Sequence, residues 1–431
     1  MSSDPLAIAP ETPSAPIPTA DTDRPLRLAY IMSRFPKLTE TFVLDEILEH
    51  ERQGHSVEVF PLWREEPDLV HGDALPIVAR AHFTPTLDMA ILRDNLHCLL
   101  SKPGLYVSTL LCLVRANRRS LRYLAGALAV FPKACSFARR MRRLGIDHVH
   151  AHFASHPAAA AFVVGRFSGI PWSFTAHGSD LHREQSMLRE KVEEAAFVVA
   201  ISDYNRRFIL DRVGQPCAPK LVVIHCGIDP ARHGRARRRK AAEEPFEIVC
   251  VGTLHEVKGQ GFLLEACAAL TDRGLRWRCH LIGDGPDRER LETRARELGI
   301  GERVIFHGGC ERREVGRLLS QMDVCVAPSI PTRDGRREGI PVVLMEAAAA
   351  ALPLVGSRLS GIPELVSDGE TGLLVEPGDV GGLVTALERI ARDPRLADRL
   401  GTNAHALLES AFDLERNVAR LREQIRTGVA A

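Results

Sequence analysis

The sequence predicts an α/β protein made of two Rossmann-like, doubly wound domains that face each other across a cleft. Short apolar runs rich in β-branched residues alternate with helical patterns, which is typical of parallel sheets covered by helices on both faces. The alternation stops once, over a polar and arginine-rich stretch from Ala231 to Glu244, and then starts again. The 431 residues are enough for more than one core. A ligand is expected in the cleft, near the carboxyl ends of the strands.

Six runs in each half have the length and composition of buried strands. Those of the first half are Leu26–Met32, Val57–Leu62, His148–Phe153, Trp172–His177, Phe197–Ser202 and Leu221–Ile228. Those of the second half are Phe246–Gly252, Cys279–Gly283, Val304–Gly308, Val324–Ser329, Leu352–Gly356 and Gly372–Glu376.

The same pattern predicts where the domains begin and end. Residues 1–23 are rich in Pro, Ser, Thr and Ala and are predicted to be a disordered tail. The first domain is expected over residues 24–230 and the second over 246–403, with a linker at 231–245 between them. Residues 404–431 are expected to form a helix that packs back toward the first domain.

Composition excludes several classes of protein. The 56 Lys and Arg nearly balance the 55 Asp and Glu, so we expect no nucleic-acid partner. Ten cysteines occur without a C-x-x-C pair, which indicates buried thiols in a reducing compartment. The first residues do not resemble a secretory signal, and no apolar run reaches the length of a membrane span. We expect a cytoplasmic protein, peripheral at most to the inner face of the plasma membrane.

One segment does not fit a plain Rossmann-like domain. Residues 95–146 contain ten basic side chains and no acidic one. Val107, Leu110, Leu111 and Val114 follow helical spacing, and a basic set follows the same spacing behind them. That set is Arg115, Arg118, Arg119 and Arg122. The segment is either a helix with a solvated face or a docking surface for an anionic membrane.

Two groups of residues that could carry chemistry have simpler explanations. Gly283-Asp284-Gly285-Pro286 lacks the third glycine of a dinucleotide fingerprint, and Asp287 would repel a pyrophosphate, so a structural turn is favoured. His148, His150 and His152 share one face of a predicted strand, but no obvious carboxylate or thiol completes a metal site. Satisfied core or cleft histidines are the interpretation we prefer.

The strongest group lies between Pro328 and Glu376. A polar loop is followed by Glu338 and by a helix that Pro341 can start and that carries Glu346. Free backbone N–H groups at a helix start can bind an anion, and a carboxylate beside them can meet sugar hydroxyls. Taken singly, each acidic residue would be a capping or surface group.

Together these residues form known motifs. Glu338 and Glu346 have the E-x₇-E spacing, and Gly361-Ile362-Pro363-Glu364 follows them. With Val251-Gly252-Thr253-Leu254, Lys258-Gly259 and His177-Gly178-Ser179-Asp180, they resemble the retaining glycosyltransferases of family four, which have the GT-B fold. Ser33-Arg34-Phe35-Pro36 and Glu338-Gly339-Ile340-Pro341 are similar to exopolysaccharide enzymes of the colanic-acid type. The resemblance covers the chain from about Leu26 to Asn403.

The resemblance implies catalytic roles for three residues. Lys258 would neutralise the diphosphate leaving group, and Glu338 would contact the transferred sugar near its reacting face. His177 would hydrogen-bond the donor sugar from the opposite domain. No metal or other cofactor is required, because cations and helix ends stabilise the phosphates.

The resemblance also implies a donor-binding set in the second domain. Glu346 would bind the ribose of the nucleotide, and backbone N–H groups around Gly361 and Ile362 would assist at the diphosphate. Thr253, Gly339 and Ile340 complete the set. Two positions depart from the family pattern: Thr253 stands where Arg is common, and Ala351 stands where the helix usually ends in Gly. Lys258 would then act alone, or another cation would substitute, such as Arg333, Arg336 or Arg337.

The function implied by the resemblance is a retaining hexosyl transfer from a UDP- or GDP-sugar. The acceptor would be a lipid-linked oligosaccharide in exopolysaccharide or cell-surface polysaccharide synthesis, bound by the first domain. An anionic membrane surface, contacted through residues 95–146, is a further expected partner. Two alternatives are a GT-B epimerase of sugar nucleotides and a non-catalytic, two-lobed binder of sugars or nucleotides.

Overall fold

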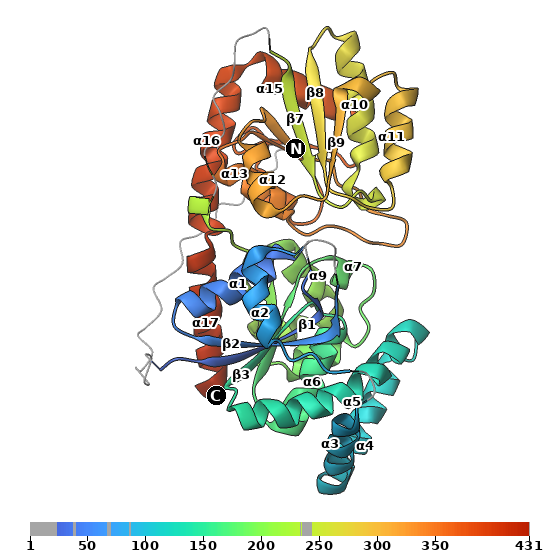
Figure 1. Ribbon diagram of the computed structural model, residues 1–431, viewed down its shortest axis with the longest axis vertical. Coiled ribbons are helices and arrows are strands. Elements are labelled where there is room, and N and C mark those ends of the chain that lie inside the picture. The colour runs from blue at the N-terminus through green and yellow to red at the C-terminus, as the bar shows by residue number, and fades with distance from the viewer. Residues whose placement is uncertain are drawn as a thin grey trace, which may run out of the picture.

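The protein folds into two lobes, each built on a parallel six-stranded sheet (Figure 1). The computed structural model describes residues 24–37, 40–66, 70–85, 88–232, 234 and 244–430. The predicted tail at 1–23 and most of the predicted linker at 231–245 lie outside these residues. The α/β class with two doubly wound sheets is therefore confirmed.

The first lobe has the strand order β2-β1-β3-β4-β5-β6, with every pair parallel. Its strands are β1 (Arg27–Phe35), β2 (Ser56–Arg64), β3 (His148–His152), β4 (Trp172–Ala176), β5 (Phe197–Ala200) and β6 (Leu221–Val223). Its helices are α1 (Thr41–Arg52), α2 (Leu75–Arg80), α3 (Met89–Ser101), α4 (Pro103–Asn117), α5 (Leu121–Leu144), α6 (His156–Ser168), α7 (Ser179–His182), α8 (Leu188–Glu194) and α9 (Asp203–Val213).

The second lobe has the order β12-β11-β10-β7-β8-β9, again parallel throughout, which is the order of a dinucleotide-binding fold. Its strands are β7 (Phe246–Val251), β8 (Trp277–Ile282), β9 (Val304–Gly308), β10 (Val324–Ala327), β11 (Leu354–Ser357) and β12 (Leu373–Val375). Its helices are α10 (Gln260–Asp272), α11 (Arg288–Glu297), α12 (Arg312–Leu319), α13 (Val342–Ala349), α14 (Ile362–Leu365), α15 (Val380–Arg392) and α16 (Pro394–Ala411).

Every predicted strand forms; β10 is apolar along its whole length, as burial on both faces favours, whereas β3 contains three buried histidines. All residues of β3, β4 and β10 are buried. The boundaries differ by up to five residues: β6 ends at Val223 rather than Ile228, and β1 continues past Met32 to Phe35. The turn after α13 is left-handed although Ala351 replaces glycine there: its φ is 56°. That conformation costs a non-glycine residue about 1–2 kcal/mol.

The chain between β2 and β3 forms a helical insertion, of which α3 and α4 project from the first lobe, away from the second (Figure 1). The helical pattern predicted from Val107 to Arg122 is divided, because α4 ends at Asn117 and α5 begins at Leu121. Ser120 caps α5 by accepting a hydrogen bond from the backbone N–H of Tyr123 at 3.4 Å.

The last helix, α17 (Leu414–Ala430), leaves the second lobe and packs along the first, as Figure 1 shows in red. Leu421 and Ile425 are buried in the core that β1 and α1 form. The crossing is fixed by backbone hydrogen bonds from Ile228 to Phe412 and from Leu414 to Ile228, both 3.0 Å.

Two further contacts join the lobes. Arg312 of α12 forms a two-pronged ion pair with the buried Asp45 of α1. Glu364 of α14 accepts hydrogen bonds from the backbone N–H groups of Asp203 and Tyr204, at the start of α9, both at 3.0 Å. Helix starts favour such carboxylates, so these contacts hold the two lobes facing each other.

Candidate active site

The cleft between the lobes has a volume of 840 Å³, which is in the range of small-molecule binding sites. Residues of both lobes line it, at the carboxyl ends of β1, β3 and β4 in the first lobe and of β7, β8 and β9 in the second. Seven of the nine predicted site residues lie in its wall: His177, Thr253, Lys258, Glu338, Gly339, Ile340 and Glu346.

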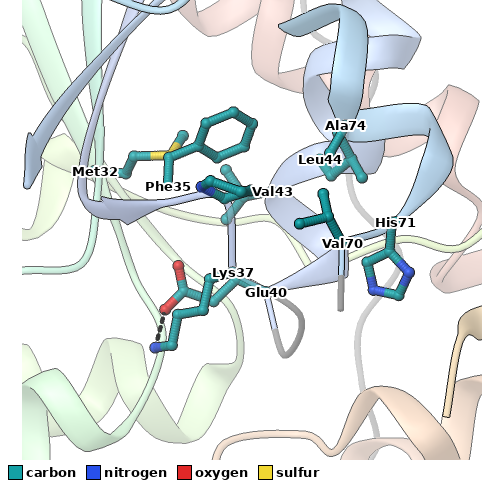
Figure 2. A pocket seen from close by; sticks show the side chains of 10 residues that line it. Met32, Phe35, Lys37, Glu40, Val43, Leu44, Val70, His71 and Ala74 are labelled. Atoms are coloured by element: carbon teal, nitrogen blue, oxygen red, sulfur yellow. Dashed lines mark hydrogen bonds and ion pairs between the residues drawn. The ribbon is translucent and has the colours of Figure 1, made fainter. Parts of the chain in front are cut away.

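A second cavity lies beside the cleft, at the start of α1, and is too small for a substrate. Figure 2 shows Met32, Phe35 and Val43 in its wall and the ion pair of Lys37 with Glu40 at 2.5 Å. Its volume of 10 Å³ has room for about one water molecule. Lys37 and Glu40 also line the cleft, so this ion pair contributes to the wall of the larger site.

His177 is held firmly at the end of β4. Its ring packs between Phe42 and Phe153, with ring centroids 4.7 Å away on each side. Burial lowers the pKa of His177 well below its usual value, so the imidazole is neutral. A neutral ring adds no positive charge to this part of the cleft.

A row of buried polar groups leads from His177 into the first lobe. Nε2 of His177 lies 3.1 Å from Nδ1 of His152, whose Nε2 lies 3.3 Å from Oε1 of Glu46. Tyr30 donates to the same carboxylate oxygen at 2.6 Å. Burial alone would raise the pKa of Glu46, but His152 and His150 bring it below its usual range. A carboxylate beside Nε2 of His152 favours a proton there, which leaves Nδ1 of His177 as an acceptor, with the thiol of Cys226 at 3.8 Å as its partner.

The same row could hold a metal by position alone, since ligand atoms of Glu46, His150 and His152 lie within 4.8 Å of one another. However, both ring nitrogens of His150 hydrogen-bond hydroxyl groups, Ser173 at 2.7 Å and Thr175 at 2.8 Å. His150 therefore matches the expectation of a satisfied histidine, whereas Nδ1 of His148 has no hydrogen-bond partner among the described residues. Sequence reasoning missed Glu46 because it lies on α1, about a hundred residues from the histidines, in no recognisable motif.

Asp180 holds the loop that carries His177. Its buried carboxylate accepts backbone hydrogen bonds from Ala154 and Gly178 at 2.6 Å and from His177 at 3.1 Å. The loop lies directly against the second lobe: a Cβ on Gly339 would fall 2.5 Å from the carbonyl oxygen of His177. Glycine is therefore required at 339 for this approach of the lobes.

Lys258 and Glu338 form an ion pair inside the cleft. Nζ of Lys258 lies 2.5 Å from Oε1 of Glu338, and Ser329 donates to the other carboxylate oxygen at 2.5 Å. Lys258 ends the short 3-10 helix η4 (Glu256–Lys258), and the turn after it approaches β10 closely. A Cβ on Gly259 would meet the carbonyl oxygen of Pro328 at 1.9 Å. The sequence spacing thus brings the predicted cation and carboxylate together.

Glu346 is the buried carboxylate of the second lobe's wall. It lies in α13 with 8% of its surface exposed, and burial raises the pKa of its carboxyl while Arg312 opposes that rise. Among the described residues, no side chain or backbone group hydrogen-bonds its carboxylate. Because Arg312 is bound to Asp45, Glu346 has acceptor oxygens available to a ligand in the cleft.

Gly361 and Ile362 lie differently from the rest of the predicted set. Neither is in the wall of the cleft. Gly361 packs against Ser202 of the first lobe, and the N–H of Ile362 donates to the carbonyl of Leu359 at 3.1 Å. In this arrangement of the lobes the Ile362 N–H is not free to bind a diphosphate, so that role stays a prediction.

The loop before α13 supplies the cations that Thr253 does not. Arg336 and Arg337 line the cleft, whereas Arg333 does not. The guanidinium of Arg336 lies 3.2 Å from Nε2 of His255, three residues from Lys258. Arg337 donates to the hydroxyl of Tyr204 at 2.9 Å.

In a comparison with known proteins, each lobe matches a protein family model. Residues 39–232 match the family model "Glycosyltransferase Family 4" and residues 235–407 match "Glycosyl transferases group 1". The chain is 28% identical to the putative colanic acid biosynthesis glycosyltransferase WcaL of Salmonella typhimurium, over 93% of this chain and all of that one. It is 27% identical to the amylovoran biosynthesis glycosyltransferase AmsK of Erwinia amylovora, with the same coverage.

A relative that matches a shorter part of the chain and several solved structures agree with this family assignment. The glycogen synthase of Mycobacterium tuberculosis is 31% identical over 64% of this chain and 68% of that one. Anabaena HepE in complex with UDP superposes with a TM-score of 0.70 over 93% of this chain and all of that one, at 18% identity. Sucrose-phosphate synthase from Thermosynechococcus elongatus gives 0.68 over 94% and 99%, at 20% identity. The chain belongs to family four of the glycosyltransferases, a family of retaining enzymes with the GT-B fold.

Proposed function

We propose that the protein transfers a hexose from a UDP- or GDP-sugar to a lipid-linked oligosaccharide at the cytoplasmic face of a membrane. The product would enter an exopolysaccharide or another cell-surface polysaccharide. One observation carries the proposal: the buried Glu346 carboxylate opens into the cleft with no hydrogen-bond partner among the described residues, near several cations. A nucleoside diphosphate supplies what this wall would bind: the two ribose hydroxyls can donate hydrogen bonds to the carboxylate, and the diphosphate brings negative charge to the cations.

The donor's diphosphate is assigned to Lys258 and Arg336. Negative charge grows on the leaving diphosphate as its bond to the anomeric carbon breaks, so cations there stabilise the transition state more than the bound substrate. In the structure Lys258 is paired with Glu338 at 2.5 Å. When phosphate takes the lysine, the Glu338 carboxylate becomes free to accept hydrogen bonds from the sugar.

The sugar itself is assigned to the narrow part of the cleft, between Glu338 and His177. The neutral His177 accepts a sugar hydroxyl through Nδ1, and Gly339 allows the lobes to approach closely behind it. Closure of the lobes excludes the water that would otherwise hydrolyse the donor. The acceptor hydroxyl then bonds the anomeric carbon, and its proton passes to the departing diphosphate.

The relatives support the proposed exopolysaccharide product more than they support any particular donor sugar. WcaL and AmsK are named for colanic acid and amylovoran, and both match this chain over their whole length. Solved HepE complexes hold UDP and UDP-glucose, consistent with a nucleotide-sugar donor here. A lipid-linked acceptor places the first lobe at a membrane, and docking through residues 95–146 belongs to the same proposal.

The test is incubation with a panel of UDP- and GDP-sugars, with and without lipid-linked oligosaccharides from an exopolysaccharide-producing bacterium. The expected result is release of one nucleoside diphosphate that depends on the acceptor. Conversion of the donor sugar without acceptor would indicate an epimerase. Tight donor binding with no turnover under any condition would indicate a binding protein, and either outcome would overturn the proposal.

A further inference from the structure

Exposed apolar side chains gather on one part of the molecule, the projecting helices α3 and α4 with the start of α5 (Figure 1). We call this segment, residues 89–128, the apolar hairpin. Ten of the twelve large apolar residues that are exposed in the described chain belong to it. Apolar patches of this kind mark interaction sites, because soluble surfaces rarely concentrate them.

Helix α3 carries leucines on its exposed face, whereas its buried face mixes Ile91 and Cys98 with polar side chains. Leu92, Leu96 and Leu100 are exposed by 62%, 53% and 73%, in one stripe along the helix. The opposite face buries Asp94 at 4% exposure, bonded to Arg139 at 2.8 Å and to Ser136 at 2.7 Å. A helix that only covers the lobe's core would turn its leucines inward.

Helix α4 continues the apolar surface. Val107, Leu111 and Val114 are exposed at a helical spacing. Leu110, which the sequence pattern grouped with them, is instead half-buried against the core of the lobe. The exposed apolar stripe of α4 is therefore narrower than the sequence pattern predicts. The exposed leucines of α3 extend it.

Positive charge borders the apolar surface. Arg115, Arg118, Arg119 and Arg122 are exposed, and none of them forms an ion pair with any described residue. Arg122 also lines the cleft, so Arg115, Arg118 and Arg119 are the cations left for the lipid surface. The absence of acidic side chains from residues 95–146 argues against a second copy of this chain as the occupant, because the positive charges of the two copies would repel each other. A surface that is apolar inside and negatively charged at its rim is that of an anionic bilayer.

The shape of the apolar hairpin fits a position among the lipid headgroups better than a transmembrane span. In the described chain, no helix on its own has the length and apolar content to span a membrane. The pair α3 and α4 meets that test only jointly, and its two helices are bent by 112° at the break between them. Helices with a one-sided apolar stripe lie in the plane of the headgroups.

We propose that the apolar hairpin inserts into the cytoplasmic leaflet as a wedge, with its arginines at the headgroups of anionic lipids. The inference rests on the proposed function and deepens it. It assigns membrane attachment to the leucine stripe, with the basic side chains guiding the approach. The first lobe then lies on the surface from which a lipid-linked acceptor emerges.

Co-sedimentation of the full chain with phosphatidylcholine vesicles containing phosphatidylglycerol tests the wedge. The wild type should bind, and part of the binding should persist at about 1 M salt, where charges are screened beyond about 3 Å. Replacing Leu92→Gln, Leu96→Gln and Leu100→Gln together should weaken binding about 100-fold or more. The matched control changes the other two exposed apolar residues, Leu75→Gln and Val429→Gln, and should bind as the wild type does.

Nucleotide binding separates a failed wedge from a failed function. The leucine variant should bind the nucleoside diphosphate as the wild type does, because Leu92, Leu96 and Leu100 are not in the wall of the cleft. A wild type that ignores anionic vesicles at low salt overturns the wedge, as does a leucine variant that binds vesicles normally. So does a wild type that is dimeric in solution and becomes monomeric in the leucine variant, since the stripe would then bind a second copy.

Discussion

Replacing Glu346→Gln should weaken nucleotide binding while leaving the fold intact. The carboxylate is buried, lines the cleft and accepts no hydrogen bond among the described residues, so a ribose diol would be its partner. A hydrogen bond to a charged group contributes about 1.5–3 kcal/mol, which corresponds to a Kd raised about 10- to 150-fold. Glutamine has nearly the same shape but one acceptor oxygen and no charge.

Titration calorimetry with UDP and GDP measures this change, and deoxynucleotides identify its cause. A 2′,3′-dideoxynucleoside diphosphate should bind the wild type and the Glu346→Gln variant with similar affinity, because the hydroxyls that the carboxylate would bind are absent. The free variant should melt no lower than the wild type, since an unpaired buried charge is removed. The matched control is Glu311→Gln, an exposed carboxylate of the same lobe.

Two results would refute this reasoning. Unchanged affinity of the Glu346→Gln variant for both nucleotides would remove Glu346 from the site. An equal loss for the dideoxynucleotide would show that the carboxylate acts through something other than the ribose hydroxyls.

Three further predictions concern the rest of the site and the core. Arg336→Ala should lower kcat at saturating donor by about tenfold or more, whereas Arg333→Ala, outside the cleft, should leave it unchanged; equal effects would deny Arg336 a place at the diphosphate. Glu46→Gln should lower kcat without changing nucleotide Kd, and ¹⁵N NMR should show a changed tautomer of His177; an unchanged ring spectrum would contradict the positioning role. The free energy of unfolding should fall as the pH drops from about 6.5, because burial lowers the pKa of His148 to about 3 and the unfolded chain binds the proton first. This contributes about 1.4 kcal/mol per pH unit, so chemical denaturation should show a slope shallower by that amount in His148→Asn.

The fold could be predicted well because parallel strands leave a continuous apolar signature. All residues of β10 are buried, as its apolar sequence from Val324 to Ala327 indicates. The strand ends were less certain: β1 runs to Phe35, since Arg34 and Phe35 still pair with Trp63 and Arg64 of β2. Pairing with a neighbour, which no single run of sequence contains, decides where such a strand ends.

The site was predictable where its residues follow one another along the chain. Glu338 and Glu346 share one loop-helix unit, so their spacing defines their relation. The partners across the lobes were not: Asp45 holds Arg312 from 267 positions away. The state of Ile362 was also hidden, because the hydrogen bond of its N–H to Leu359 depends on the local turn.

The most direct test of the central claim is NMR of the transfer reaction with a donor sugar labelled with ¹³C at the anomeric carbon. With the lipid-linked acceptor present, the signal should move to a new glycosidic linkage of the same anomeric configuration, as nucleoside diphosphate appears. The Lys258→Ala variant should bind the donor but transfer sugar about a hundredfold or more slowly, because the cation stabilises the leaving group chiefly in the transition state. If no sugar nucleotide is consumed with any acceptor, or if Lys258→Ala transfers at the wild-type rate, the cleft does not work as described.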